Sequence, residues 1–246
     1  MPDNAADDAG HTAASSFVIS VVIPTLDSAP SVAAAIRSAP PGAEVVVVDG
    51  GSGDGTAEEA ARAGARVETA PQGRAVQMNA GARAARGEIL VFLHADCRLP
   101  ADAGEQIRRV LERPGVAGGW FPQRIDAAGV LFRLGARGSN RRARLLGLPY
   151  GDQAIFTRRE ALLAAGGFPE DPIMEDAGLA RRLRRLGRLE PAESAVITGT
   201  EHWRRLGPLL TALLDYLTLG AWLAGIPPKW IAKVYFPLQQ GVRERR

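Results

Sequence analysis

The sequence is poor in cysteine, and this limits the kinds of protein it can encode. Cys97 is the only cysteine among 246 residues, so no internal disulfide can form. Disulfide-stapled secreted folds are thereby excluded, and a reducing compartment such as the cytoplasm is expected. Hydrophobic residues make up 46% and charged residues 23% of the chain, the balance of a globular protein long enough to bury a sizeable core.

The sequence also lacks a secretion signal, an internal repeat and an obvious linker. Its first sixteen residues have neither a basic segment nor an apolar segment. We therefore expect residues 1–16 to be a disordered tail and not a signal peptide. We expect residues 17–200 to form one domain and residues 201–246 a helical extension.

Acidic residues are missing from residues 127–151, a stretch that contains several arginines. We interpret the arginines of residues 181–188 as a solvated helix face. For residues 127–151, binding of phosphate or anionic lipid is the better interpretation, because no acidic residue neutralises the arginines. Nucleic acid is not expected as a partner, because aromatic residues do not alternate with the arginines.

An uncharged apolar run long enough to span a bilayer is missing as well. Residues 206–226 come closest, but Asp215 interrupts them and Gly207-Pro208 stands near their start. A helix packed on the domain and a helix lying in the membrane interface are both open alternatives. In the second, residues 206–236 contact the membrane peripherally at its inner face, and the anchors are Trp222, Lys229, Trp230 and Lys233.

Apolar, β-branched runs alternate with helical segments in the first half of the chain. This rhythm predicts an α/β fold whose mostly parallel sheet is flanked by helices. In residues 56–64, Thr56 and Glu59 have the spacing of a capping box. The later part is less regular, with a helix expected at residues 101–113, a strand pair at the sheet edge at 115–125, and a helix at 175–187 with leucines at 179, 183 and 186 on one face. The expected early strands are residues 17–24, 44–51, 65–70 and 88–94, and the helices between them are 31–39, 56–64 and 73–87.

Polar side chains follow three of the expected strands at the point where each strand ends. The carboxyl ends of parallel strands meet at one edge of a sheet, where ligands bind. Acids gathered there repel one another unless they meet a cation or hydrogen-bond donors of a ligand. The residues in question are Thr25 and Asp27, then Asp49, Ser52 and Asp54, and finally His94 and Asp96.

The glycines at positions 50, 51, 53 and 55 do not form a dinucleotide-binding fingerprint. That motif follows the first strand and enters a helix directly, whereas these glycines follow the second strand and are mixed with acids. No lysine of a phosphate-binding P-loop follows them. The alternative to a ligand-binding loop is that these glycines form a turn that only connects a strand to a helix.

Taken together, the motifs "IPTLD", "VVDGGSGDGT", "GRAVQMNAG" and "FLHAD" resemble those of the inverting family-two glycosyltransferases of GT-A fold, over residues 17–188. With "LPYGDQ" and "MED", they are most similar to a small bacterial subgroup of radical-SAM/selenodomain-associated or arsenosugar-biosynthesis glycosyltransferases. The resemblance implies a nucleotide-diphosphate sugar as donor, a divalent metal (Mn²⁺ or Mg²⁺), and an acceptor hydroxyl on a lipid, carotenoid-like or arsenosugar-pathway molecule.

The resemblance also implies roles for single residues. Asp176 is implied as the general base, with Glu175 beside it, and Asp96 as the metal ligand. One carboxylate that takes the acceptor proton while a cation supports the diphosphate suits a single inverting displacement. The implied donor-binding residues are Pro24, Thr25, Asp27, Asp49, Ser52, Asp54, Arg74, Asn79, His94, Asp152 and Gln153.

Two positions depart from the family's pattern. Asp27 stands where asparagine is usual. His94 replaces the first acid of an Asp-x-Asp motif, and three roles are open for it: contact with the ribose or donor, metal ligation, or a structural role at the strand end.

Two other functions compete with glycosyl transfer. A sugar-1-phosphate nucleotidylyltransferase also uses an α/β nucleotide-binding sheet, but the Gly-rich loop with Arg and Lys is missing after the first strand. A non-catalytic nucleotide-sugar-binding protein is the other alternative.

Overall fold

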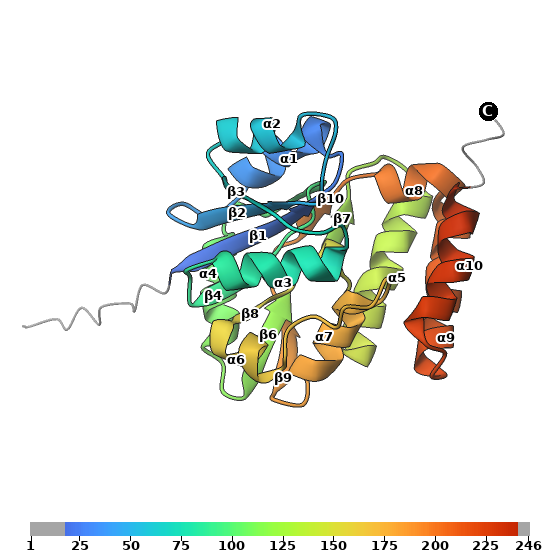
Figure 1. The fold of residues 1–246 in the computed structure, drawn as a ribbon. Helices are drawn as coiled ribbons and strands as arrows, with labels where there is room; N and C mark the ends of the chain where they lie inside the picture. Colours follow the sequence, from blue (N-terminus) through green and yellow to red (C-terminus); the bar gives the residue numbers. More distant parts are fainter. Residues whose placement is uncertain (1–17, 241–246) are drawn as a thin grey trace, which may run out of the picture.

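A seven-stranded sheet runs through the middle of the molecule in the computed structural model, which describes residues 18–240 (Figure 1). Its strand order is β3-β2-β1-β4-β8-β6-β9. All neighbours pair in parallel except β8, which is antiparallel to both β4 and β6. The predicted tail of residues 1–16 lies outside the described residues, as do the last six residues of the predicted extension. The strands are β1 (Ile19–Thr25), β2 (Glu44–Asp49), β3 (Arg66–Thr69), β4 (Ile89–Phe92), β6 (Val116–Trp120), β8 (Phe156–Arg158) and β9 (Arg188–Pro191).

Helices cover both faces of this sheet, which explains why its central strands are apolar on both sides. In β1, Val21 and Ile23 face one hydrophobic cluster and Val22 faces another. The first cluster packs under α1, α2 and α4, and the second under α3, α6 and α7. These helices are α1 (Ala29–Arg37), α2 (Thr56–Arg62), α3 (Arg74–Ala84), α4 (Ala103–Leu111), α6 (Arg159–Ala164) and α7 (Glu175–Leu183).

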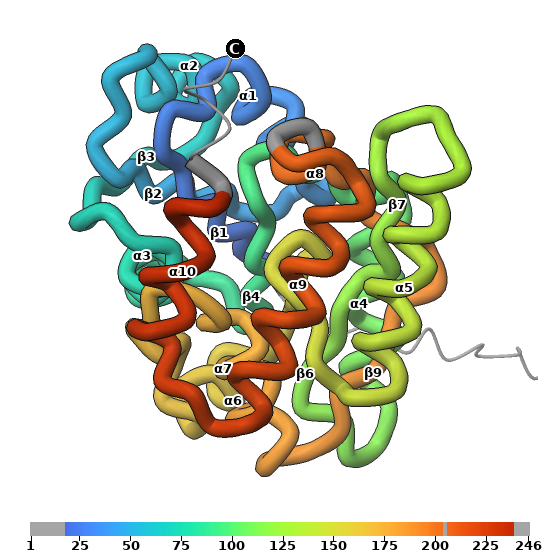
Figure 2. The backbone as a smooth tube through the Cα atoms, turned by 90° about the vertical axis from the view of Figure 1, so that its right-hand side faces the viewer, coloured from blue at the N-terminus to red at the C-terminus, as the bar shows by residue number. Residues whose placement is uncertain are grey.

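The C-terminal helices pack beside α7 and α5, with α9 between α5 and α10 (Figure 2). A second, three-stranded sheet of order β5-β10-β7 lies next to α5. Among the described residues, no helix is both long and apolar enough to cross a bilayer. These elements are β5 (Cys97–Arg98), β7 (Gln123–Ile125), β10 (Val196–Thr198), α5 (Val130–Leu146), the 3₁₀ turn η1 (Gly151–Gln153), α8 (Glu201–Leu206), α9 (Pro208–Leu223) and α10 (Pro228–Gln240).

The expected α/β fold with a mostly parallel, helix-flanked sheet and a C-terminal helical region is confirmed, but three local predictions are wrong. The strands of residues 115–125 do not pair with each other, because β6 joins the large sheet and β7 the small one. Thr56 does not cap α2: Gly55 takes the N-cap position, and the Thr56 hydroxyl donates to Asp54 instead. The helix expected to include Leu186 ends at Leu183, which leaves Leu186 exposed.

Candidate active site

The loops after β1 and β2 hold each other in place through their polar side chains. The Asp27 backbone N–H donates to Ser52 Oγ at 2.9 Å, and the Gly53 N–H donates to Asp27 Oδ1 at 3.0 Å. The Ala29 N–H donates to Asp54 Oδ2 at 3.0 Å. Thr25 and Asp49 lie opposite each other in the parallel register, directly after Pro24 and Val48. The structure therefore brings Pro24, Thr25, Asp27, Asp49, Ser52 and Asp54 together, as predicted.

Asp49 is the centre of this loop cluster. Its carboxylate accepts four hydrogen bonds, from the Thr25 and Ser52 hydroxyls at 3.1 and 2.5 Å and from the Gly51 and Ser52 N–H groups at 3.0 and 2.9 Å. Burial alone would raise the pKa of Asp49, but these hydrogen bonds outweigh burial and lower it. Four donors fill the acceptor positions of a carboxylate. A nucleotide base therefore reaches Asp49 only if one of the two hydroxyls turns away.

The backbone explains the acid at position 27. Asp27 has a φ of 48°, in the left-handed region that asparagine and aspartate tolerate better than most side chains. Asp27 in place of the family's asparagine keeps that property.

Gln77, which lies within the motif "GRAVQMNAG" but was not predicted as a site residue, links the loop cluster to α3. Its buried amide donates to the Thr25 and Val48 carbonyl oxygens at 2.8 Å each, and its Oε1 accepts from the Gly73 N–H at 3.2 Å. Gln77 thus fixes the first turn of α3, and with it Arg74, against the ends of β1 and β2.

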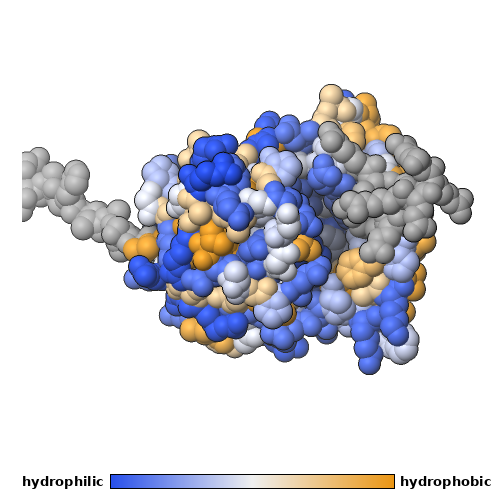
Figure 3. Space-filling model, turned by 45° about the horizontal axis from the view of Figure 1, so that its top comes forward, coloured by the Kyte–Doolittle hydropathy of each residue, from blue (hydrophilic) through white to orange (hydrophobic). Residues whose placement is uncertain are grey.

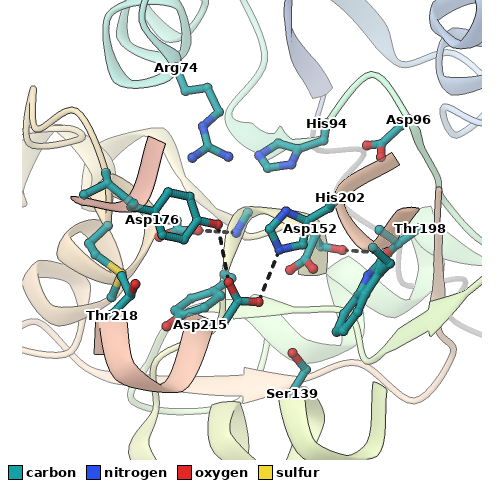
Figure 4. A pocket seen from close by; sticks show the side chains of 16 residues that line it. Arg74, His94, Asp96, Ser139, Asp152, Asp176, Thr198, His202, Asp215 and Thr218 are labelled. Atoms are coloured by element: carbon teal, nitrogen blue, oxygen red, sulfur yellow. Dashed lines mark hydrogen bonds and ion pairs between the residues drawn. The ribbon is translucent and has the colours of Figure 1, made fainter. Parts of the chain in front are cut away.

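A cavity of about 260 Å³ opens beyond this first turn (Figure 4). Arg74, His94 and Asp96 lie along one side of it, and His202 and Asp215 come from the C-terminal helices. Its full lining is Arg74, His94, Asp96, Ser139, Tyr150, Gly151, Asp152, Ile173, Met174, Asp176, Thr198, His202, Trp203, Asp215, Thr218 and Tyr235.

Glu175 orients Arg74 and does not line the cavity. The two side chains form an ion pair with 2.9 Å between Nε and Oε1; Glu175 is buried and Arg74 is half exposed. Burial raises the pKa of Glu175, Arg74 opposes the rise, and Asp176 adds to it. The guanidinium of Arg74 is thereby kept at the cavity wall, where an anionic group can be bound bidentately.

The Asp176 carboxylate is held in the cavity by backbone hydrogen bonds to both of its oxygens. Its Oδ2 accepts from the Gly151 N–H and its Oδ1 from the Ala177 N–H, both at 2.6 Å. Met174, the N-cap of α7, has a φ of 65°, a strained conformation for a side chain of this size. The local backbone thus turns Asp176 into the cavity and fixes its direction.

His94 packs directly against the same 3₁₀ turn. A Cβ atom on Gly151 would lie 2.4 Å from His94 Nε2, which is buried and has no hydrogen-bond partner. Burial, followed by the positive charges of Arg74 and His202, lowers the pKa of His94 to about 3, so the ring is neutral at pH 7. This packing favours the structural role among the three roles left open, and it leaves Nε2 closed to a metal.

Asp96 presents a carboxylate that lacks a strong partner. The Cys97 thiol, a weak donor, lies 3.6 Å from Oδ1. Burial raises the pKa of Asp96, because the charged carboxylate is poorly solvated there. A cation beside the carboxylate would offset this cost of burying its charge. Residues 18–240 contain no group of three acidic, histidine or cysteine side chains that would hold a metal alone. The site therefore fits a divalent cation only if a ligand such as a diphosphate supplies further oxygens.

Asp152, Gln153 and Asn79 differ in their access to the cavity. Asp152 lines it, with Oδ2 accepting from Gln123 at 2.7 Å, and burial raises its pKa to about 6. Gln153 is fully buried and holds Asn140 and the Tyr150 backbone. Asn79 binds both backbone groups of Phe168, at 2.9 and 3.0 Å. We correct the expected donor contacts of Gln153 and Asn79, because their amides are engaged in the scaffold and do not line the cavity.

Five lining residues from the C-terminal helices were not among the predicted site residues: His202, Trp203, Asp215, Thr218 and Tyr235. His202 Nε2 lies 3.2 Å from Asp215 Oδ2, and the Tyr235 hydroxyl donates to Asp215 Oδ1 at 3.4 Å. Burial disfavours the charged His202 ring, but the hydrogen bond and charge of Asp215 outweigh burial and raise the pKa of His202. The lone charge in the apolar run 206–226 was the available signal, because a buried charge needs partners.

The model of the family "Glycosyl transferase family 2" matches residues 20–162 of this chain. Two uncharacterized glycosyltransferases, from Mycobacterium tuberculosis and Mycobacterium bovis, are each 32% identical to it over 187 residues, which is 67% of this chain and 81% of theirs. Among solved structures, a mannosyltransferase from Pyrobaculum calidifontis in complex with GDP-Man and Mn²⁺ has a TM-score of 0.62 at 21% identity, over 92% of this chain and 70% of that chain. Glucosyl-3-phosphoglycerate synthase from Mycobacterium tuberculosis, in complex with Mn²⁺, UDP and phosphoglyceric acid, has a TM-score of 0.60 at 22% identity, over 86% and 80%. The two structures share the fold, and the family match and the mycobacterial relatives show that this chain is a glycosyltransferase that belongs to glycosyl transferase family 2.

Proposed function

We propose that the protein transfers a sugar from a nucleotide-diphosphate donor to an acceptor hydroxyl by a single, inverting displacement. The observation that carries the proposal is the convergence of Arg74, Asp96 and Asp176 on one cavity beside the loop cluster. In the proposal, that cluster receives the nucleoside and Arg74 binds the diphosphate. The family match favours glycosyl transfer over nucleotidyl transfer.

Asp176 is the base in this proposal. Its two backbone hydrogen bonds hold one carboxylate orientation, and each oxygen keeps a lone pair for the acceptor hydroxyl. Proton removal by a positioned base contributes about 10²–10⁴-fold to the rate. A divalent cation, either Mn²⁺ as in the two solved complexes above or Mg²⁺, would be held by Asp96 and the diphosphate, and its chemistry would be to stabilise charge on the departing diphosphate. His202 also lines this cavity (Figure 4).

The acceptor in this proposal is amphipathic, and the protein contacts the inner face of the membrane peripherally. Supporting this, α9 exposes Leu209 and Leu217, and α10 exposes Trp230 with the Lys233 ammonium 4.4 Å from its ring centroid. Apolar surface gathers along the right-hand edge of Figure 3, on the side of these helices. Membership of the subgroup associated with radical-SAM, selenodomain or arsenosugar proteins remains a prediction, and so does the domain boundary near residue 200.

The first test separates donor binding from transfer. UDP-, GDP- and dTDP-sugars are screened by thermal shift with and without Mn²⁺, since a donor at a hundred times its Kd stabilises the fold by about 2.7 kcal/mol. Asp96→Asn should lose the cation-dependent part of the shift. Asp176→Asn should keep the shift and lose transfer by about 10²–10⁴-fold. The control is Asp126→Asn, an exposed acid outside the cavity. Transfer at the normal rate by Asp176→Asn would rule out Asp176 as the base.

The second test addresses the membrane. Vesicles of phosphatidylglycerol should retain the protein in sedimentation more strongly than vesicles of phosphatidylcholine. Leu217→Asp should weaken this retention, whereas Leu163→Asp, an equally exposed leucine on α6, should not. Equal effects of the two substitutions would contradict a membrane face on α9.

A further inference from the structure

A second hollow, the α5–α9 groove, adjoins the cavity of the candidate active site. It has a volume of about 200 Å³ and lies between α5 and α9. Its walls are mainly apolar, with charged side chains contributed by Arg142 and Asp215 among the described residues that line it. The apolar walls come from Leu131, Leu134, Trp203, Leu209, Ala212 and Tyr216.

The groove and the cavity share three wall residues: Ser139, Trp203 and Asp215. Trp203 is 4% exposed, and its indole N–H has no hydrogen-bond partner. A buried donor of this kind is costly unless a ligand or water accepts from it. The wall shared by the two hollows thus carries two polar side chains, Ser139 and Asp215, beside the indole ring of Trp203.

Two glycines of α5 form the floor of the groove. A Cβ atom at Gly135 would lie 3.1 Å from the Trp203 ring, and one at Gly138 would lie 2.9 Å from the Tyr216 hydroxyl. The absence of side chains at these two positions therefore allows Trp203 and Tyr216 to approach α5. At the outer mouth, Leu134 and Leu209 are more than half exposed.

We propose that the α5–α9 groove binds the aliphatic part of the acceptor while the acceptor's hydroxyl enters the cavity beside Asp176. The proposal rests on the glycosyl-transfer function, and it goes further by assigning a binding site for the acceptor's tail. The occupant follows from this adjacency: a molecule with one polar and one apolar end matches a polar cavity that adjoins an apolar groove. The tail gains free energy by leaving water.

The test uses glycerol and 1-O-butyl-, 1-O-hexyl- and 1-O-octylglycerol below their micellar concentrations as probes. Their binding is measured by calorimetry on the full chain, and the same compounds then serve as acceptors with the donor identified above. Affinity should rise about fourfold per methylene until the groove is full. Ala212→Phe, which fills the groove from α9, should abolish this dependence. Ala212→Leu adds less volume and should only shorten the chain length at which affinity stops rising.

The control is Leu213→Phe, which adds an aromatic ring at an exposed neighbouring position outside the groove and should leave the dependence unchanged. Equal affinity for glycerol and octylglycerol would overturn the proposal, as would equal effects of Ala212→Phe and Leu213→Phe. An Ala212→Phe protein that loses vesicle binding or self-association but keeps the chain-length dependence would also overturn it. Chain-length-dependent binding without any transfer would leave the subsite standing and refute the proposed function.

Discussion

Gly151→Ala tests how closely the proposed base depends on its surroundings. The added methyl would lie 2.4 Å from His94 Nε2 and 2.7 Å from Cε1, whereas normal contacts are about 3.5–4.0 Å. Either the ring or the 3₁₀ turn must therefore move by about 1 Å. Gly151 has no left-handed backbone angle, so alanine adds no backbone strain of its own.

The displacement should lower activity more than stability. Overpacking a tight site costs about 1–3 kcal/mol of unfolding free energy. The Gly151 N–H also holds Asp176 Oδ2 at 2.6 Å, and a misplacement of about 1 Å at a catalytic group can cost about 10²-fold in rate. We expect kcat to fall by about that factor, with the donor-induced thermal shift retained because the loop cluster is untouched.

A double-mutant cycle decides whether His94 transmits this effect. His94→Ala removes the ring and should recover a large part of the loss in the Gly151→Ala background, a coupling of about 1–3 kcal/mol. The measurements are kcat from initial rates and the urea midpoint. Gly220→Ala, a helical glycine with open space around it, is the matched control and should change little. Additive losses in the double mutant would refute the proposed contact between His94 and the turn.

Two further predictions concern pH. Burial raises the pKa of Asp152 to about 6, so the folded protein holds this proton more tightly than the unfolded chain, and stability should fall as pH rises from about 4 to about 6. Asp152→Asn should therefore raise the unfolding free energy at pH 7.5 by on the order of 1–3 kcal/mol and have no effect near pH 3.5, as measured by urea titration. The pKa of His202 is raised because Asp215 outweighs the effect of burial, so the stabilisation by this pair should be complete below the ordinary value of 6.5 and lost as pH rises through the folded pKa. Asp215→Asn should remove this pH dependence, and a slope that persists would contradict the assignment to His202.

The first half of the fold was predictable because its signals are local. Residues 45–48 and 89–92 are apolar runs that must be covered on both faces, and helical segments alternate with such runs along the chain. The strands β6, β8 and β9 gave weaker signals. Strand β6 contains Gly118 and Gly119, β8 has only three residues, and the four residues of β9 include two charged residues and a proline. Gly119 is required by contact: a Cβ there would lie 2.4 Å from the Phe156 ring of β8. Such a pairing between distant segments cannot be inferred from either segment alone.

In the candidate site, too, groupings that follow from local sequence signals were predictable, and contacts between distant segments were not. Parallel strands end at one edge, so the grouping of Asp49 with Thr25 could be inferred from the sequence. Whether a side chain then faces a cavity depends on its tertiary partners, as Asn79 shows by binding the Phe168 backbone. His202 and Asp215 were missed because their roles arise only when α8 packs against α9 and brings the two side chains together.

The partners of Asp215 make the C-terminal helices part of the site. Leu219 and Ile231 of α9 and α10 belong to one buried cluster with Met174 and Ala177, which flank the proposed base. Removing residues 201–246 would expose that cluster and free the start of α7, while the hydrogen bonds of the loop cluster after β1 and β2 would remain. The truncated chain should therefore lose transfer by at least the 10²-fold expected for a misplaced base, yet keep part of the donor-induced thermal shift. Since the strained φ of Met174 persists only if surrounding packing enforces it, transfer at the full rate by the truncated chain would mean that α7 is ordered by the sheet alone.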